Sequence, residues 1–461
     1  MVRRVALVSM FPENRGGGAG MVAYQLARHL SSRCRVLVLC PGNRTELVER
    51  PDGLSLLAVG SIGTDDLWYP HLEHRTVKRT FSLLDEFDPD IVHTHDAVSL
   101  GCVAQYWALS RRVPFVHTLH VQADHILEFG AAERARFLTR LIGHPLALSY
   151  SRVFYSHCRA LLAPNETAAR SVGRLGINTP VFVVPNGCEL AQFCKCRFAD
   201  QGGAERNLCF VGYLSERKNQ LYLVEMLRHL PPEFRLQLVG KALSSGYEKR
   251  LRGQVDRLAP GRVEFTGSVA FARIPSLLER SHLFVSASTL EVQSLVVIEA
   301  LASGTPVVGL ANETIDELVD EKVGRRLRRD ATPAEFTRGI RKVCSLSQDE
   351  YDSMCRRARA RVERLDWDDV ATATTSAYQS VLARERAPAP IRAAGSPIGR
   401  MARRRGLPAS TRFYAGLNNG SCSALWLLHQ GFSAVRRVPS PNRLIRQGVG
   451  SIAGSRWNLP R

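Results

Sequence analysis

The residues best suited to chemistry are two glutamates, Glu291 and Glu299, in the segment STLEVQSLVVIEALASGTPVV that spans 288–308. An apolar helix start lies between them, and the run after Glu299 reaches Gly304 and Pro306 before a short apolar strand. A loop-to-helix turn of this kind offers backbone N–H groups to an anion and carboxylates to sugar hydroxyls. The pattern indicates a site for a small polar ligand, although two glutamates at this spacing also fit a solvated helix face.

A pair of cations occupies a comparable place earlier in the second half of the chain. Arg217 and Lys218 follow the apolar strand expected at 208–212 and lead into a helix. Ligands of open α/β sheets bind beyond the carboxyl ends of the strands, so these side chains could receive a diphosphate. The alternative is an exposed basic pair on a solvated surface.

A glycine-rich turn, RGGGAG at 15–20, follows the first expected strand and precedes a helix. Glycines let a backbone approach a ligand closely, and a helix N-terminus favours an anion. No Gly-Lys-Ser/Thr follows, so the turn is not a Walker loop, and the second strand ends at 40–42 without an acid that could hold a ribose. A plain tight turn is the alternative interpretation.

His120 ends another expected strand, 115–120. A neutral imidazole at that position could exchange hydrogen bonds with a sugar hydroxyl, or it could be a structural histidine. His93, His95 and His117 lie on similar strands without evident carboxylate partners, and a Cys-x-Cys pair at 194–196 is too tight for usual zinc ligation. We therefore expect no metal site.

These residues must be positioned by a regular scaffold. Short apolar strands alternate with helical stretches through each half of the chain, which predicts an α/β protein with two doubly wound parallel-sheet domains facing across a cleft. The expected organisation is a first domain at 1–187, a linker at 188–205, a second domain at 206–366, a helix at 367–385 and a tail at 386–461.

Composition agrees with a protein that folds in the cytoplasm. The chain has 461 residues, of which 45% are hydrophobic, and no apolar run approaches the ~18–20 residues that span a bilayer. The start of the sequence has no signal-peptide pattern. The 11 cysteines are scattered and odd in number, which indicates reduced thiols rather than a disulfide framework.

The positive charge is concentrated in the tail. Residues 386–461 contain 13 Arg and no Lys, Asp or Glu, out of a net charge of +19 for the whole chain. The tail is rich in Pro, Gly and Ser, so we expect it to be largely disordered. Its segment 423–437 clusters Trp, Leu and Phe beside Arg, which fits an interfacial helix on an anionic membrane or simply a solvated tail with one apolar patch. No aromatic platform supports a nucleic-acid partner.

In order along the chain, these motifs resemble the family-4 retaining glycosyltransferases of the GT-B fold. The resemblance covers roughly residues 4–384 and is carried by the glutamate segment together with Gly17-Gly18, DIVHTH at 90–95, Pro185-Asn186-Gly187 and Phe265-Thr266-Gly267. The helix that begins at Trp367 resembles the family's last helix, which crosses back to the first domain.

The resemblance implies a role for each matching residue. Glu299 would bind the ribose of a nucleotide sugar, Glu291 would hold hydroxyls of the donor sugar, and Lys218 would bind the diphosphate and stabilise the leaving nucleotide. His120 would contact the donor sugar near the reacting carbon. The remaining donor-binding candidates are Gly17, Gly18, Arg217, Ser294 and Leu295. The family is independent of metals and cofactors and retains the anomeric configuration.

Two positions depart from the family pattern. Tyr213 stands where the family usually has Arg, and Gln293-Ser294 replaces its usual Phe-Gly. A phenol supplies no permanent positive charge, and Ser294 adds a side chain beside the donor sugar. Weak activity or an altered donor is therefore one expectation, as is a degenerate protein that binds nucleotide sugar without turnover.

The acceptor is indicated only by resemblance to one branch of the family. Glu291-x-Gln293, HDAVSLG at 95–101 and HTLH at 117–120 resemble the branch that glucosylates diacylglycerol. The resemblance implies a peripheral enzyme at the inner face of the membrane, moving a hexose from UDP-glucose to a lipid hydroxyl. Transfer to a soluble or cell-wall saccharide and a sugar-nucleotide epimerase on the same fold are the alternatives.

Overall fold

The structure is a computed structural model that describes residues 2–13, 17–64, 67–71, 73–120, 144–193, 203 and 205–386. The arginine-rich tail, its expected interfacial helix and the Cys-x-Cys pair lie outside the described residues. The chain divides into two compact units, one of Met1–Gln122 with Arg152–Ala393 and a second of Ala123–Ser151 with Ala394–Arg461. Both β-sheets belong to the first unit.

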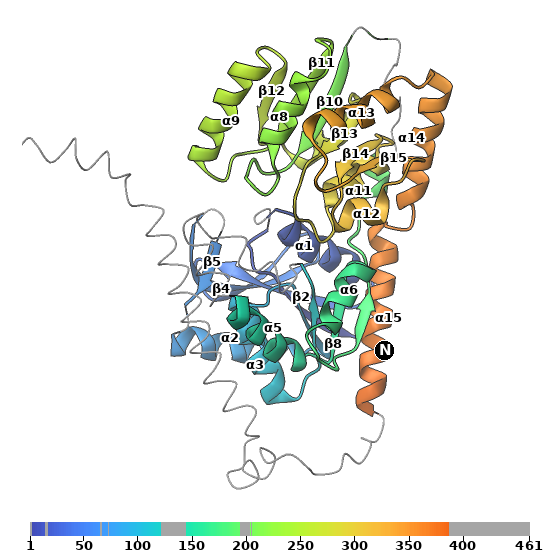
Figure 1. The fold of residues 1–461 in the computed structure, drawn as a ribbon. Coiled ribbons are helices and arrows are strands. Elements are labelled where there is room, and N and C mark those ends of the chain that lie inside the picture. The colour runs from blue at the N-terminus through green and yellow to red at the C-terminus, as the bar shows by residue number, and fades with distance from the viewer. Residues whose placement is uncertain are drawn as a thin grey trace, which may run out of the picture. The chain divides into compact units, whose positions relative to one another are not determined.

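The first sheet is built from the N-terminal half, as Figure 1 shows in blue to green. Its strand order is β3-β4-β2-β1-β6-β7-β8-β9, with β5 paired to β4. The strands are β1 (Arg4–Val8), β2 (Arg35–Gly42), β3 (Glu46–Glu49), β4 (Ser55–Thr64), β5 (Leu67–Pro70), β6 (Ile91–Thr94), β7 (Phe115–Thr118), β8 (Ala160–Ala163) and β9 (Val181–Val183). Strands β3 and β5 run antiparallel to β4, and the path from β4 to β9 is parallel.

Helices connect these strands, as expected for parallel crossovers. They are α1 (Gly17–Ser31), α2 (His74–Phe87), α3 (Ser99–Arg111), α5 (His144–Ser156) and α6 (Glu166–Gly173). Helix α1 buries Val22, Leu26 and Leu30 against the sheet, the face that the sequence spacing predicted.

The second sheet has the strand order β12-β11-β10-β13-β14-β15, with every pair parallel. Its strands are β10 (Arg206–Val211), β11 (Phe234–Val239), β12 (Val263–Gly267), β13 (Leu283–Ser286), β14 (Val307–Leu310) and β15 (Gly324–Leu327). The helices are α7 (Leu190–Phe193), α8 (Gln220–Arg228), α9 (Ser245–Leu258), α10 (Ile274–Glu279), α11 (Leu295–Ala302), α12 (Glu313–Leu318), α13 (Pro333–Cys344) and α14 (Gln348–Val362), with a 3-10 turn at Phe271–Arg273. This is the doubly wound order that binds ligands where the strand order reverses.

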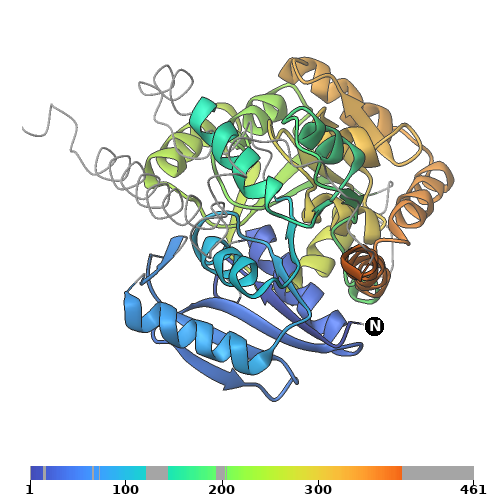
Figure 2. The same ribbon diagram turned by 90° about the horizontal axis from the view of Figure 1, so that it is seen from below.

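Helix α15 (Trp367–Arg386) leaves the C-terminal domain and packs on the N-terminal one. Trp367, Val370 and Tyr378 are buried in the same apolar cluster as α1 and the first sheet. Figure 1 shows the helix running beside the N-terminal domain, and Figure 2 views it end-on. A Cβ on Gly187 would lie 2.4 Å from the Trp367 ring, so glycine is required where the chain first leaves the N-terminal domain.

The predicted fold class is confirmed, with differences in detail. The sequence analysis did not indicate β3, β4, β5 or β15. Charged residues interrupt β3 and β15, and glycine and serine interrupt β4, whereas β5 is only four residues long and ends in proline. The expected linker 188–205 is not irregular at its start. Cys188 forms a β-bridge with Asp366, and Phe193 of α7 is fully buried among side chains of the C-terminal domain.

Candidate active site

The predicted cations and the first predicted glutamate follow neighbouring strands of the second sheet. Strands β10 and β13 pair directly, and the strand order reverses between them. Arg217 and Lys218 lie in the loop after β10, and Glu291 lies in the loop after β13. Parallel strands present their carboxyl ends at one edge, which brings these three side chains together.

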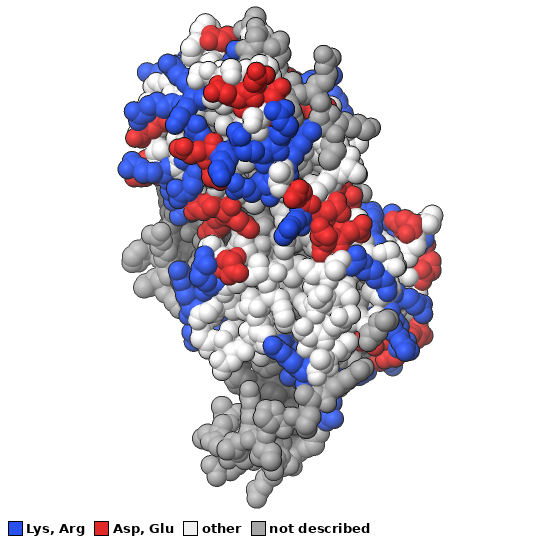
Figure 3. Space-filling view, turned by 90° about the vertical axis from the view of Figure 1, so that its right-hand side faces the viewer, with Lys and Arg blue, Asp and Glu red and all other residues white. Residues whose placement is uncertain are grey.

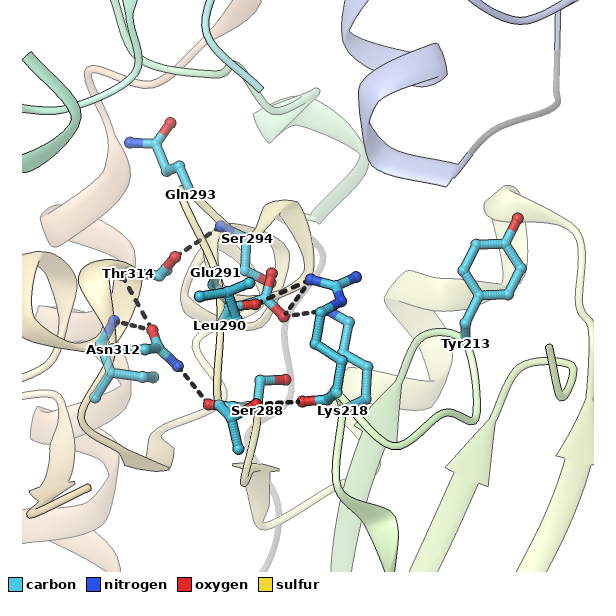
Figure 4. Close-up of polar contacts among 12 residues, drawn as sticks. Tyr213, Lys218, Ser288, Leu290, Glu291, Gln293, Ser294, Asn312 and Thr314 are labelled. Carbon is cyan, nitrogen blue, oxygen red and sulfur yellow. Dashed lines mark hydrogen bonds and ion pairs between the residues drawn. The ribbon is translucent and has the colours of Figure 1, made fainter. Parts of the chain in front are cut away.

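Lys218 and Glu291 form a buried ion pair, drawn in Figure 4 with the two side chains pointing toward one another. Their side chains are 11% and 10% exposed. Arg217 Nη1 lies 3.8 Å from the same carboxylate oxygen and donates to the Leu290 carbonyl at 2.9 Å. Two cations therefore converge on one carboxylate, a concentration of positive charge that suits an anionic ligand.

Charge keeps Glu291 ionised despite its burial. Burial alone raises the pKa of this carboxyl, but the positive charges of Lys218 and Arg217 and hydrogen bonds from Lys218 and Ser288 outweigh it and lower the pKa below its ordinary value. The carboxylate can therefore accept hydrogen bonds from ligand hydroxyls at neutral pH.

Polar residues at the start of helix α12, which follows the neighbouring strand β14, hold the loop that carries Glu291. The Asn312 amide donates to the Ser288 carbonyl at 3.1 Å, while its oxygen caps helix α12. The Ser294 backbone N–H donates to Thr314 Oγ1 at 2.8 Å. These contacts, visible in Figure 4, fix both ends of the 288–294 loop.

Glu299 is buried on helix α11, and its carboxylate has no hydrogen-bond or ion-pair partner among the described residues. It is 5% exposed, and burial raises its pKa to about 7. An unpaired buried carboxylate is destabilising unless a ligand supplies donors, so Glu299 is well suited to accept hydrogen bonds from a diol such as a ribose. Ser294 and Leu295 begin the same helix.

The glycine turn lies against the C-terminal domain. A Cβ on Gly17 would come within 2.9 Å of the Tyr213 ring, and one on Gly18 within 3.6 Å of Leu295. Gly17 also has a φ of +58°, which favours glycine. The Lys241 ammonium, a cation that the sequence motifs did not indicate, lies 5.8 Å from the centre of the Tyr213 ring. Residues 14–16, which include Arg15 and Gly16 of the predicted turn, lie outside the described part of the chain.

His120 belongs to a cluster of imidazoles rather than to the charged group. His95 Nδ1 lies only 2.7 Å from His120 Nε2, the His93 ring packs against His95, and His117 lies on β7, three residues before His120. Burial lowers the pKa of His120 to about 4 and those of His93 and His117 to about 3. No group of three or more metal-ligating side chains occurs within the described ranges.

Sequence reasoning missed the contribution of Gln293. Figure 4 shows its side chain pointing away from Glu291. Its oxygen accepts from the Asn186 backbone N–H at 2.6 Å, and its nitrogen donates to the Pro164 carbonyl at 3.0 Å. Asn165 adds a bond to the Val292 carbonyl at 2.7 Å. The Pro-Asn-Gly motif at 185–187 was a signal for this contact, but it did not identify the partner.

The structure thus places the predicted residues in three groups. Arg217, Lys218 and Glu291 touch one another; Ser294, Leu295 and Glu299 share α11, with Gly17 and Gly18 nearby. No hydrogen bond, ion pair or ring contact joins His120 to either group among the described residues. The functional roles of these residues stay predictions.

The C-terminal domain also carries a basic surface away from these residues. Figure 3 shows Lys and Arg side chains gathered on the upper part of one face. A shallow cavity of about 300 Å³ is lined by Arg326, Arg328, Arg338 and Lys342, but the three arginines pair with Asp316, Asp330 and Glu335. None of the predicted site residues lines this cavity. Exposed, paired arginines of this kind are ordinary surface ion pairs.

Comparison with known proteins agrees with the geometry. Residues 16–192 match Glycosyltransferase Family 4, and residues 205–345 match Glycosyl transferases group 1. The fold and the paired matches define the GT-B class, with Glycosyltransferase Family 4 matched over the N-terminal half of the chain and Glycosyl transferases group 1 over the C-terminal half.

Individual relatives are distant. The chain is 27% identical over 267 residues to an alpha-monoglucosyldiacylglycerol synthase of Streptococcus pneumoniae, a match that covers 54% of this chain and 58% of that protein. It is 25% identical over 352 residues to a glycogen synthase of Mycobacterium tuberculosis, covering 72% and 74%. The first match therefore spans less than two thirds of the relative's length.

A solved structure shares the fold. Anabaena Alr3699/HepE, solved in complex with UDP and glucose, superposes with a TM-score of 0.64 at 20% identity, covering 82% of this chain and all of that one. Within the described residues, no helix is long and apolar enough to cross a membrane.

Proposed function

We propose that this protein transfers a hexose, with retention of anomeric configuration, from UDP-glucose to a hydroxyl of a membrane lipid. The observation that carries the proposal is the buried contact of Lys218 and Arg217 with Glu291 at the point where the strand order of the second sheet reverses. This arrangement provides cations for a diphosphate and a carboxylate for sugar hydroxyls in one place.

Each part of the donor has a complementary partner in the proposal. The unpaired Glu299 carboxylate accepts from the ribose, and the diphosphate lies near Lys218 and the N-terminus of α1. When the bond between the sugar and the diphosphate breaks, negative charge develops on the leaving oxygen. A preorganised cation at that position lowers the barrier by roughly 3–4 kcal/mol.

The lipid acceptor is supported by two independent features. The Streptococcus pneumoniae relative is named as a synthase of a glucosyldiacylglycerol. The sequence of the tail, with 13 Arg and no acidic residue, suits an anionic membrane surface, where each basic residue contributes roughly 1 kcal/mol. We therefore place the enzyme at the inner face of the membrane as a peripheral protein.

The test is UDP release from UDP-glucose in the presence of anionic vesicles with and without diacylglycerol. Release that depends on diacylglycerol, beyond hydrolysis, is the expected result. Release that depends instead on a soluble glucan would overturn the lipid acceptor and support the second candidate. That candidate, transfer to a saccharide, is favoured by the glycogen synthase relative, whose match covers more of both chains.

A third outcome concerns turnover itself. Tyr213 lies against Gly17 where the family has a permanent cation, and Lys241 is the nearby substitute. If calorimetry detects UDP binding but no acceptor supports release, the protein binds a nucleotide sugar without turnover and the proposal of transfer fails.

A further inference from the structure

The ends of β6 and β7 bring together four histidines whose rings are neutral at pH 7. Burial lowers the pKa of His120 to about 4 and places that of His95 well below its ordinary value. A neutral imidazole carries one proton on either Nδ1 or Nε2, so each ring must adopt one of two tautomers. Which tautomer His120 adopts decides whether the nitrogen that it offers to a ligand is a donor or an acceptor.

His95 and His120 share a single hydrogen bond. His95 Nδ1 lies 2.7 Å from His120 Nε2, and the two rings are stacked with centroids 5.0 Å apart. Because both rings are neutral, one of these nitrogens carries the proton and the other accepts. The direction of this hydrogen bond therefore fixes both tautomers at once.

The second ring nitrogen of His95, Nε2, determines the direction of the hydrogen bond between His95 and His120. His95 is only 7% exposed, and its Nε2 is buried without any hydrogen-bond partner. On one side the ring packs against His93, at 4.6 Å between centroids. If His120 donated, the His95 proton would have to reside on Nε2, as a buried N–H without an acceptor. Buried N–H donors without an acceptor are rare in folded proteins. An unprotonated His95 Nε2 without a donor therefore costs less free energy than a protonated one without an acceptor.

The surrounding residues hold His95 in this arrangement. His93 makes a hydrogen bond through each nitrogen, 2.6 Å to the Tyr378 hydroxyl and 2.7 Å to Thr118 Oγ1. His117 Nδ1 lies 3.1 Å from the Thr94 carbonyl. The neighbouring polar groups are thus engaged elsewhere, and none of them offers His95 Nε2 a partner.

We propose that His95 is a positioning residue that sets the tautomer of His120: His95 Nδ1–H donates to His120 Nε2, and His120 carries its own proton on Nδ1. His120 is half-buried, and its Nδ1 has no partner among the described residues. His120 therefore presents an N–H donor to a hydroxyl oxygen of the bound sugar. The donor-sugar part of this inference rests on the proposed function, whereas the tautomer itself does not.

The direct test is NMR of the whole chain labelled with ¹⁵N-histidine. Long-range ¹H–¹⁵N spectra distinguish a protonated Nδ1 from a protonated Nε2, and His120→Gln and His95→Asn assign the two rings. We expect both rings to show a protonated Nδ1 and a bare Nε2 at pH 7. A protonated Nε2 on His120 overturns the proposal.

Variants of His95 separate positioning from packing. In His95→Asn the amide N–H replaces Nδ1–H as a donor, so the His120 tautomer and kcat should stay close to wild type. In His95→Leu that donor is lost, and we expect a mixed tautomer at His120 and a kcat lower by about 10- to 100-fold, the range typical of residues that orient a functional group. The exposed His229, replaced by Asn, is the matched control and should change neither measurement.

The outcomes distinguish this inference from the proposed function. If wild type releases UDP but His95→Leu does so at full rate, the positioning role is wrong and the proposed function stands. If wild type shows no turnover, the function fails, and the ¹⁵N spectra still decide the tautomer. Should His95→Leu fail to fold in a thermal melt, the spectra of wild type and the kcat of His95→Asn remain decisive.

Discussion

The side-chain oxygen of Gln293 accepts a hydrogen bond from the backbone N–H of Asn186 at 2.6 Å, and both residues are buried. Gln293 belongs to the loop that carries Glu291, and Asn186 follows the last strand of the N-terminal sheet. Asn186 Nδ2 returns a bond of 3.3 Å to the Gln293 carbonyl. The glutamine that distinguishes this chain from the usual family pattern thus ties the candidate site to the other domain.

Replacing Gln293 by Ala should destabilise the protein. The change leaves the Asn186 N–H buried without its acceptor, which costs about 1–3 kcal/mol of unfolding free energy. Urea unfolding measures the loss, with the exposed Gln192→Ala as control. Equal midpoints for the two variants would show that this hydrogen bond contributes nothing.

Lys218→Met should lower both the turnover rate and the free energy of unfolding. Turnover should fall by about 10²–10³-fold because the leaving group loses its cation. Stability should fall by about 3–5 kcal/mol, since Glu291 stays buried with a weaker partner. The double variant Lys218→Met/Glu291→Gln should recover stability without activity, while the exposed Lys249→Met should match wild type. A double variant as unstable as the single one would contradict the pairing.

Glu299→Gln should weaken nucleotide binding and increase the free energy of unfolding. The folded pKa of about 7 exceeds the ordinary value of 4.5, so ionising this carboxyl destabilises the fold as pH rises from about 4.5 to 7. The amide avoids that cost, and the variant should gain up to about 3 kcal/mol at pH 8 and nothing at pH 4. Denaturant titrations at the two pH values measure the gain.

The same carboxyl should make nucleotide binding depend on pH. UDP affinity should rise with pH through about 7, with release of a proton, because the ionised form is the better acceptor for ribose hydroxyls. Calorimetry in buffers of different ionisation enthalpy detects the proton. Binding by Glu299→Gln that shows the same proton release would assign it to another group.

His29 should stabilise the fold most strongly in acid. Its Nδ1 lies 2.9 Å from Asp368 and its Nε2 3.0 Å from Glu189; burial lowers its pKa, but these hydrogen bonds outweigh burial and raise it overall. A raised pKa means that the contribution is complete below the unfolded value near 6.5 and is lost as pH rises through the folded value.

The difference in unfolding free energy between wild type and His29→Gln should therefore be larger at about pH 5.5 than at about pH 9. Thermal or urea unfolding at both pH values measures it, and the exposed His229→Gln is the control. A difference that grows toward the alkaline end would mean that His29 is held in its neutral form.

The alternation of apolar strands with helices in the sequence predicted the two doubly wound sheets. A strand that is buried on both faces is a continuous apolar run, which can be recognised in the sequence. The same pattern placed Arg217, Lys218 and Glu291 at strand ends, and parallel topology then requires them to share an edge. Short edge strands such as β3 escaped detection, since their mostly exposed side chains keep no apolar pattern.

Only the tertiary structure decided the pairings between distant residues. Nothing in the order of residues joins His93 to Tyr378 or Asn186 to Gln293, because those hydrogen bonds depend on how packed elements orient individual side chains. Neighbouring charge likewise distinguished two buried glutamates: Glu291 has cations beside it and a lowered pKa, whereas Glu299 lacks them and has a raised pKa. The sequence by itself determined which groups reach the site, and the packing around each determined its charge.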